Sequence, residues 1–276
     1  MSNSKPRVAA VQMATGPNVS ANLHEAERLV GEAAKGGAGL VVLPENFAFM
    51  GTREQDKLTL CEKDGEGPLQ SFLSGVAARY GVWLVGGTLP LCARDAGRVR
   101  AASLVFNERG NRVARYDKIH LFDVSLPEAD ERYVESSTIE AGEDVVVIDS
   151  PFGRLGIAVC YDLRFPEMFR QMLDSGMELL AIPAAFTSIT GRAHWEILVR
   201  ARAIENLAYV VAAAQGGYHI NGRVTHGHSM IVDPWGTVLA QVPRGTGCIC
   251  CPLDGDFQAS VRRNFPAIEH RRLKIR

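Results

Sequence analysis

Short apolar runs alternate along this chain with segments of helical periodicity, and this alternation restricts the possible folds most strongly. Several runs, such as residues 40–43 and 209–213, are apolar at nearly every position. A strand that is apolar on both faces has to be covered on both sides. The pattern therefore predicts an α/β fold, with helices packed against sheets.

The expected elements follow from these runs and from their turn residues. Strands are expected at residues 7–13, 40–43, 83–89, 102–106, 112–116, 145–149, 155–160, 179–183, 209–213, 229–232 and 237–241. Helices are expected at residues 23–33, 69–80, 166–175 and 194–208. In the last helix, an apolar stripe is formed by Ile197, Ala201, Ile204 and Ala208.

Charge and composition narrow the classes of function. The chain has 276 residues and a formal net charge of -1, so it lacks the basic excess of nucleic-acid-binding and membrane-surface proteins. No stretch offers the ~20 apolar residues of a membrane-spanning helix, and the run at 8–11 is too short for a signal-peptide core. We expect a reduced, soluble, cytoplasmic protein without nucleic-acid or membrane partners. No linker divides the sequence, so residues 1–276 are expected to form one domain.

Ionisable residues directly follow three of the expected strands. They are Glu45 after 40–43, Lys118 after 112–116, and Cys160 at the end of 155–160. Taken singly, each has a plain structural explanation: a solvated carboxylate, a surface ammonium and a small buried hydrophobe. Taken together, they supply a base for a thiol proton, a cation for a tetrahedral oxyanion and a nucleophile.

The order of these three patches resembles the nitrilase superfamily of carbon–nitrogen hydrolases, and within it the Nit branch. The run Cys160-Tyr-Asp-Leu-Arg-Phe-Pro-Glu167 carries most of the resemblance, which extends from Val8 to Pro266. The resemblance implies a four-layer α-β-β-α sandwich that assembles into homodimers or larger homo-oligomers. It also implies an amidase that needs no metal or organic cofactor.

The resemblance also implies roles for single residues. Glu45 matches the general base, Lys118 the charge-stabilising lysine and Cys160 the nucleophile. Glu135 aligns with a second glutamate that holds the lysine, and the backbone N–H of Tyr161 would join Lys118 at the oxyanion. Cys160 would attack an amide carbon, Glu45 would pass the thiol proton to the leaving amine, and water would then hydrolyse a thioester.

The implied substrate is a small amide. Deaminated glutathione, N-(4-oxoglutaryl)-L-cysteinylglycine, fits the resemblance best, and α-ketoglutaramate or α-ketosuccinamate, the substrates of ω-amidases, are the alternative. Such substrates carry carboxylates, and Arg164 is a candidate to bind one, although it could equally pair with Glu167 or Asp162. Phe186 and Thr187 match the family position that lines the acyl pocket, or they are strand-end packing.

Other arrangements of reactive residues are open to simpler explanations. His226 and His228 lie two apart, but no evident third ligand completes a metal site, and we predict none. Cys248, Cys250 and Cys251 are expected to be strand cysteines. A thiol-based sensor that uses Cys160 for redox exchange is a different class of function, but it would not need a proton shuttle. A nitrile hydrolase with the same sulfur chemistry is a third.

Overall fold

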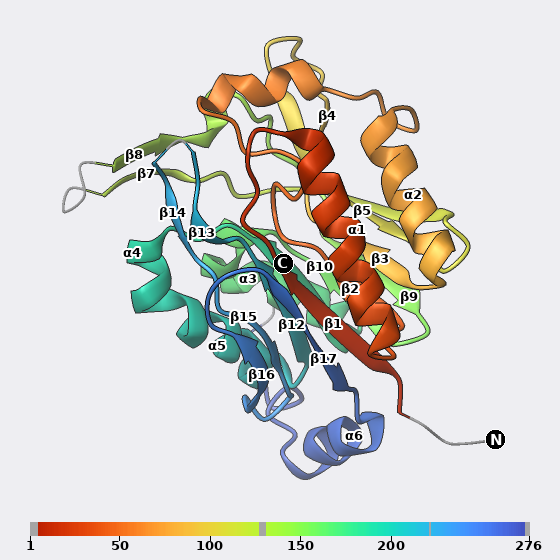
Figure 1. Ribbon diagram of the computed structural model, residues 1–276. Helices are drawn as coiled ribbons and strands as arrows, with labels where there is room; N and C mark the ends of the chain where they lie inside the picture. Colours follow the sequence, from red (N-terminus) through yellow and green to blue (C-terminus); the bar gives the residue numbers. More distant parts are fainter. Residues whose placement is uncertain (1–4, 127–130, 221, 274–276) are drawn as a thin grey trace.

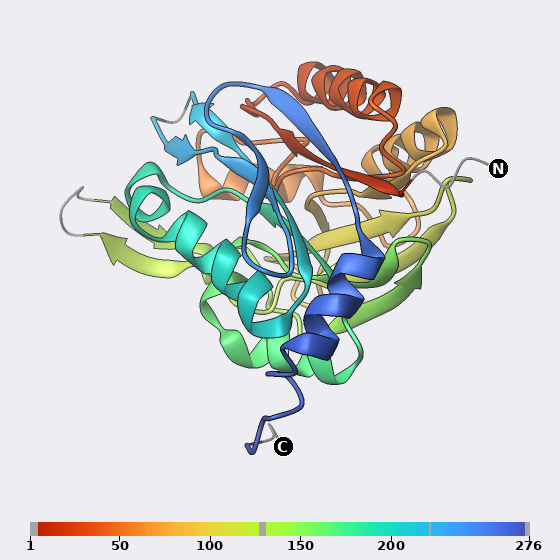
Figure 2. The ribbon, with the colours of Figure 1, turned by 90° about the horizontal axis from the view of Figure 1, so that it is seen from below.

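The computed structural model describes residues 5–126, 131–220 and 222–273 (Figure 1). Two β-sheets pack face to face, and helices cover the outer face of each sheet (Figures 1 and 2). This is the four-layer α-β-β-α arrangement that the resemblance to the nitrilase superfamily implies.

The first sheet has, among the described residues, seven strands in the order β17-β1-β2-β3-β5-β4, and β6 also pairs with β5. Its strands are β1 (Arg7–Gln12), β2 (Leu40–Val42), β3 (Trp83–Val85), β4 (Leu89–Cys92), β5 (Val99–Phe106), β6 (Arg112–Asp117) and β17 (Gly247–Pro252). Its outer face is covered by α1 (Val19–Lys35) and α2 (Pro68–Tyr80).

The second sheet has the order β16-β15-β12-β11-β10-β9 within the same described ranges. Its strands are β9 (Val146–Ser150), β10 (Gly153–Ile157), β11 (Leu179–Ala184), β12 (Tyr209–Ala214), β15 (Ser229–Val232) and β16 (Val238–Val242). Its outer face is covered by α3 (Pro166–Asp174) and α5 (Glu196–Asn206).

Smaller elements complete the fold. Two hairpins are formed by β7 (Asp123–Leu126) with β8 (Glu131–Val134), and by β13 (Gly216–Tyr218) with β14 (Val224–His226). The remaining helical segments are η1 (Glu54–Leu60), η3 (Glu135–Ser137), η4 (Cys160–Arg164), α4 (Ser188–Thr190), η5 (Gly191–Trp195) and α6 (Gly255–Asn264). Neither hairpin was expected from the sequence.

Side-chain alternation explains why the central strands are apolar on both faces. In β1, Val8 and Ala10 belong to the core that reaches the second sheet, whereas Ala9 and Val11 pack with α1 and α2. Successive side chains of a strand point to opposite faces, so one apolar run contributes to two cores. In β17, Cys251 belongs to the first of these cores, and Cys248 and Cys250 pack against the second.

The strand expected at 83–89 is interrupted, and glycine is the reason. Gly87 has a φ of 59°, and a Cβ at this position would lie 2.1 Å from the carbonyl oxygen of Pro44. The chain therefore passes so close to the segment after β2 that only glycine fits. β3 and β4 are consequently separate strands, and the glycine packs directly against the residue before Glu45.

The stripe expected on the fourth helix is divided between surface and core, and its last member, the fully buried Ala208, lies beyond the end of α5. Ile197 and Ile204 are 69% and 45% exposed, whereas Val199 and Ala203 are fully buried. α5 packs on the sheet through these smaller residues, and its Arg202 donates to the carbonyl of Leu163. Ile197 and Ile204 are therefore left on the outer surface.

The sequence predicts reduced thiols, and one pair of cysteines in the structure departs from this prediction. Cys61, which follows η1, and Cys92, at the end of β4, form a disulfide with Cα atoms 5.5 Å apart. None of the helices in the described residues is long and apolar enough to cross a membrane.

Candidate active site

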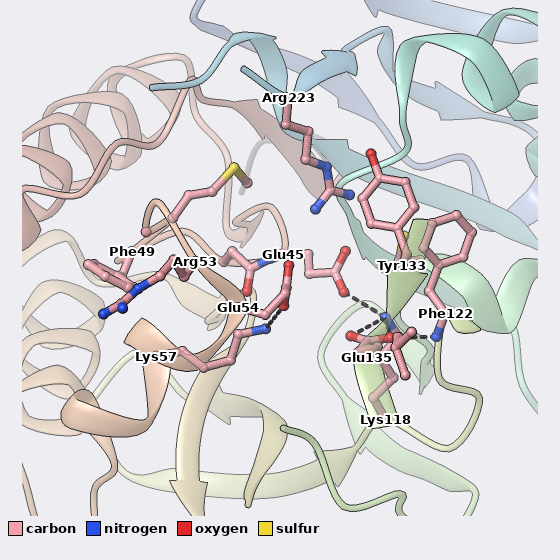
Figure 3. A pocket seen from close by; sticks show the side chains of 15 residues that line it. Glu45, Phe49, Arg53, Glu54, Lys57, Lys118, Phe122, Tyr133, Glu135 and Arg223 are labelled. Atoms are coloured by element: carbon pink, nitrogen blue, oxygen red, sulfur yellow. Dashed lines mark hydrogen bonds and ion pairs between the residues drawn. The ribbon is translucent and has the colours of Figure 1, made fainter. Parts of the chain in front are cut away.

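Glu45, Lys118 and Cys160 line one cavity, although they come from both sheets. Figure 3 shows Glu45 and Lys118 side by side in it. Glu45 follows β2, Lys118 follows β6, and Cys160 follows β10. The ammonium of Lys118 donates from Nζ to Glu45 Oε1 at 2.8 Å. All three residues are buried, with exposures of 4%, 2% and 7% respectively. The cavity volume of ≈ 60 Å³ exceeds the ~10–15 Å³ that one water needs.

A second carboxylate holds the lysine from the opposite side. Glu135, at the start of η3, accepts from Lys118 Nζ through both oxygens at 2.9 Å. Its Oε2 also accepts from the backbone N–H of Phe122 at 2.6 Å. The ammonium is therefore fixed between two carboxylates, and Glu135 links it to the backbone of Phe122.

The backbone around Glu45 is fixed by contacts with the second sheet and with β4. The side chain of Gln215, after β12, donates to the carbonyl of Glu45 at 2.9 Å. The N–H of Asn46, whose φ is 57°, donates to Thr88 Oγ1 at 2.8 Å. The carboxylate of Glu45 is therefore presented from a segment that has little freedom to move.

Cys160 lies in a sharp turn with a φ of 49°, a conformation that costs energy for a residue with a Cβ. β10 ends at Ile157, earlier than expected, and η4 begins at Cys160 itself. The fully buried Asp162 stabilises the turn, because its Oδ2 accepts from the N–H of Val159 at 2.8 Å and from the hydroxyl of Tyr116 at 2.6 Å.

Asp162 also connects the turn to the segment that follows Lys118. Its Oδ1 accepts from the N–H of His120 at 3.1 Å and lies 2.7 Å from Nδ1 of the same residue. This positioning role of Asp162 was not predicted from the sequence. The signal was an aspartate two residues after a strand-end cysteine, where its short side chain can bond to the local backbone.

The electrostatics of the three groups favour a neutral thiol beside a charged pair. Burial opposes the charge on Glu45, but Lys118 outweighs it and lowers the pKa of the carboxyl. Burial likewise opposes the charge on Lys118, but Glu135 and Glu45 raise its pKa well above the usual value. Burial, assisted by the charge of Glu45, raises the pKa of Cys160. The resting site therefore holds a carboxylate, an ammonium and a protonated thiol.

A second, smaller cavity also adjoins Cys160. It is lined by Phe122, Cys160, Tyr161, Arg164, Ala185, Phe186, Thr187 and Thr190. The guanidinium of Arg164 lies 5.6 Å from the ring centre of Tyr161 and 5.5 Å from that of Phe186. Within the described residues, Arg164 forms no ion pair with Glu167 or Asp162; its Nη1 lies 3.2 Å from His194 Nδ1. Thr187 caps α4 by accepting from the N–H of Thr190.

The two histidines of the 226–228 segment stack on each other, with ring centres 4.3 Å apart. Burial, together with the charge of His228, lowers the pKa of His226 to about 4. Among the described residues, no group of three or more His, Cys, Asp or Glu side chains is arranged to hold a metal ion.

Comparisons with known proteins show the family of the chain. The model of the carbon-nitrogen hydrolase family matches residues 7–262. The chain belongs to the carbon–nitrogen hydrolase family. The enzyme class and the nitrilase-type resemblance predicted from the sequence are thereby confirmed.

Relatives of this carbon–nitrogen hydrolase are similar over nearly the whole chain. A protein of Synechocystis named deaminated glutathione amidase is 42% identical over 95% of this chain and 97% of its own length. The crystal structure of Saccharomyces cerevisiae Nit3, a member of branch 10 of the nitrilase superfamily, has a TM-score of 0.87 at 31% identity, covering 98% of this chain and 97% of that one. The C. elegans NitFhit protein has a TM-score of 0.87 at 36% identity; the match covers 99% of this chain and 66% of that longer chain.

Proposed function

We infer that this carbon–nitrogen hydrolase cleaves deaminated glutathione to 2-oxoglutarate and cysteinylglycine through a thioester on Cys160. The observation that carries the proposal is the contact of Lys118 with Glu45 beside Cys160 in one cavity. The substrate is proposed from the relatives that are named deaminated glutathione amidase.

The proposed first step forms the carbon–sulfur bond. Glu45 is ionised and Cys160 is protonated, so the carboxylate takes the thiol proton as sulfur attacks the amide carbon. The oxyanion is stabilised by the ammonium of Lys118 and by the backbone N–H of Tyr161. Glu135 acts through Lys118, whose position it fixes.

The second half of the reaction returns the enzyme to its starting state. Glu45 gives its proton to the amide nitrogen, the carbon–nitrogen bond breaks, and cysteinylglycine leaves as the free amine. Glu45 then takes a proton from water, whose oxygen attacks the thioester, and the proton returns to the sulfur as 2-oxoglutarate forms. These steps call for no metal or organic cofactor, because the sulfur and the carboxylate supply both nucleophile and proton transfer.

The acyl part of the substrate is assigned to the smaller cavity. Arg164 would bind the 2-oxo acid carboxylate there, since its planar guanidinium suits bidentate recognition of a carboxylate. Phe186 packs against Arg164, and Thr187 shapes the adjoining wall through its contact with Thr190.

The decisive experiment measures kcat/KM for deaminated glutathione and for α-ketoglutaramate by following release of 2-oxoglutarate. We expect a higher value for deaminated glutathione; the reverse order would assign the chain to the ω-amidases. Cys160→Ala and Cys160→Ser should abolish turnover of both substrates. Unchanged turnover in either pure variant would contradict the assignment of the nucleophile.

Further properties are proposed with the activity. The protein is expected to be cytoplasmic, to bind neither nucleic acid nor membranes, and to fold as one domain over residues 1–276. We also infer a homodimer or larger homo-oligomer, because apolar side chains on α5, α6 and the adjoining turn are exposed, namely Ile197, Ile204, Trp235, Phe257 and Phe265.

Light scattering after gel filtration tests the assembly. The wild-type chain should elute at a multiple of its 30.0 kDa mass, and Trp235→Glu should shift it towards the monomer. A wild-type protein that is monomeric at micromolar concentration would refute the oligomer.

A further inference from the structure

The two cavities beside Cys160 receive different parts of the substrate, given the function proposed above. Cys160 and Phe122 line both cavities, whereas Glu45 lines the larger one and Arg164 the smaller one. Glu45 delivers a proton to the departing nitrogen, so this nitrogen has to lie on the side of Glu45. The leaving group therefore extends into the larger cavity.

Charged side chains line the wall of that cavity beyond the catalytic residues. Lys57 donates to Glu54 at 2.7 Å, so the positive and the negative charge of this pair neutralise each other. The exposed guanidinium of Arg53 pairs with Asp56 and is turned away from Glu45 (Figure 3).

Arg223, just before β14, points into the cavity from the wall opposite Lys57 (Figure 3). Its Nη2 donates to the carbonyl of Ala185 at 2.6 Å, and its guanidinium lies 5.2 Å from the ring centre of Tyr133. These contacts orient the guanidinium before any ligand arrives. Burial opposes the charges of Glu45 and Glu54, and the charge of Arg223 adds to those of Lys118 and Lys57 in lowering the pKa of the two carboxyls.

We propose that Arg223 binds the free carboxylate of the leaving group, and thereby makes the enzyme selective for amides whose departing amine is an amino acid or a small peptide. In cysteinylglycine this carboxylate belongs to the terminal glycine. A preoriented guanidinium is suited to bind it through charge-assisted hydrogen bonds. Simple ω-amides, which release ammonia, offer no such group.

The test compares substrates that share the 2-oxoglutaryl group and differ only in the leaving amine. They are deaminated glutathione, the same compound with its terminal carboxyl converted into a carboxamide, and α-ketoglutaramate. A charged hydrogen bond contributes enough for roughly 10- to 100-fold in kcat/KM. We expect the wild-type enzyme to prefer the carboxylate over the carboxamide by this factor.

Variants then assign the preference to one residue. Arg223→Gln should reduce the carboxylate-to-carboxamide ratio to within about threefold of unity, and Arg223→Lys should retain part of it. Arg53→Gln is the matched control. It removes the same charge from the wall of the larger cavity, but the guanidinium of Arg53 is turned away from Glu45, so the ratio should stay at the wild-type value. Thermal unfolding of each variant verifies the fold, and the wild-type ratio itself tests the proposal without any variant.

The outcomes separate this proposal from the proposed function. If the wild-type enzyme cleaves the carboxylate and carboxamide equally well, or if Arg223→Gln keeps the full ratio, the role of Arg223 is refuted while the amidase activity stands. If the wild-type enzyme cleaves neither peptide amide, the substrate assignment fails, and the role of Arg223 fails with it.

Discussion

The hydroxyl of Tyr116 donates a 2.6 Å hydrogen bond to Asp162, and this bond joins the two sheets at the catalytic cavity. Tyr116 precedes Lys118 by two residues, and Asp162 follows Cys160 by two. The bond therefore sets the position of the ammonium relative to the sulfur. Burial, together with the charge of Asp162, raises the pKa of Tyr116 well above its usual value, so the hydroxyl remains a neutral donor.

Tyr116→Phe should lower both stability and activity. It removes a buried hydrogen bond to a carboxylate, so we expect a loss of about 1.5–3 kcal/mol in the free energy of unfolding. The turn that carries Cys160 would also be held less firmly, and kcat/KM should fall roughly 10- to 100-fold. Urea unfolding and steady-state kinetics measure the two effects. Tyr218→Phe removes a hydroxyl from a residue that is 86% exposed and should change neither; equal behaviour of the two variants would contradict the role of this bond.

Glu45→Gln should make the thiol more acidic while it makes the enzyme slower. The charge of Glu45 raises the pKa of Cys160, second only to burial, so its removal beside the remaining ammonium favours the thiolate. Loss of the base should lower kcat by roughly 10²- to 10⁴-fold. Thiolate absorbance during a pH titration measures the pKa, with the double variant that also carries Cys160→Ala as the background. A thiol pKa that stays the same or rises would show that the carboxylate is not beside the sulfur.

Glu135→Gln should shift the basic limb of the pH profile. Burial lowers the pKa of Lys118, and Glu135 is the strongest of the charges that raise it. Without that charge the lysine loses its proton at lower pH, so the decline of kcat/KM at high pH should begin earlier. At neutral pH we expect a decrease of roughly 10- to 100-fold, because the ammonium is less well fixed.

The conservative variant separates charge from packing at this position. Glu135→Asp keeps a carboxylate, and it should restore the basic limb even if the neutral rate stays low. A Glu135→Gln enzyme with an unshifted basic limb would mean that Glu135 does not control the protonation of Lys118.

The raised pKa of Lys118 also makes the stability of the fold depend on pH. A lysine whose pKa is raised by folding stabilises the protein below its unfolded value of 10.5, and this contribution disappears as the pH rises through the folded value. The stability difference between wild type and Glu135→Gln should therefore be larger at pH 7 than at strongly alkaline pH. Guanidinium unfolding at several pH values measures it.

Gly87→Ala should lower stability and activity, although Gly87 is not itself a catalytic residue. The new Cβ would lie 2.1 Å from the carbonyl oxygen of Pro44, at a φ of 59°. Backbone strain alone costs about 1–3 kcal/mol, and displacement of Pro44 would move Glu45, so kcat should fall as well. Gly75→Ala on the exposed face of α2 meets nothing within 4 Å and should instead raise stability by about 0.5–1 kcal/mol. If both variants behave alike in thermal unfolding and kinetics, the close approach does not matter.

The sequence by itself determined the α/β class and the three chemical groups, and its family resemblance implied the four layers. The expected strands match β1, β2, β5, β11, β12 and β15 within a few residues, because a run that is apolar on both faces can be buried in only a few ways. The placement of Glu45, Lys118 and Cys160 at strand ends was also visible, since each follows directly after an apolar run.

Tertiary structure decided everything that depends on contacts between distant segments. Four features arise from the order in which the strands pair. They are the break between β3 and β4 at Gly87, the exposed isoleucines of α5, the bond between Tyr116 and Asp162, and the approach of Arg223 to the cavity. Periodicity reports which residues share a face of one element, but the neighbour that covers the face is chosen by long-range pairing. The types of catalytic group in this protein could therefore be predicted from the sequence, whereas their positions relative to one another could not.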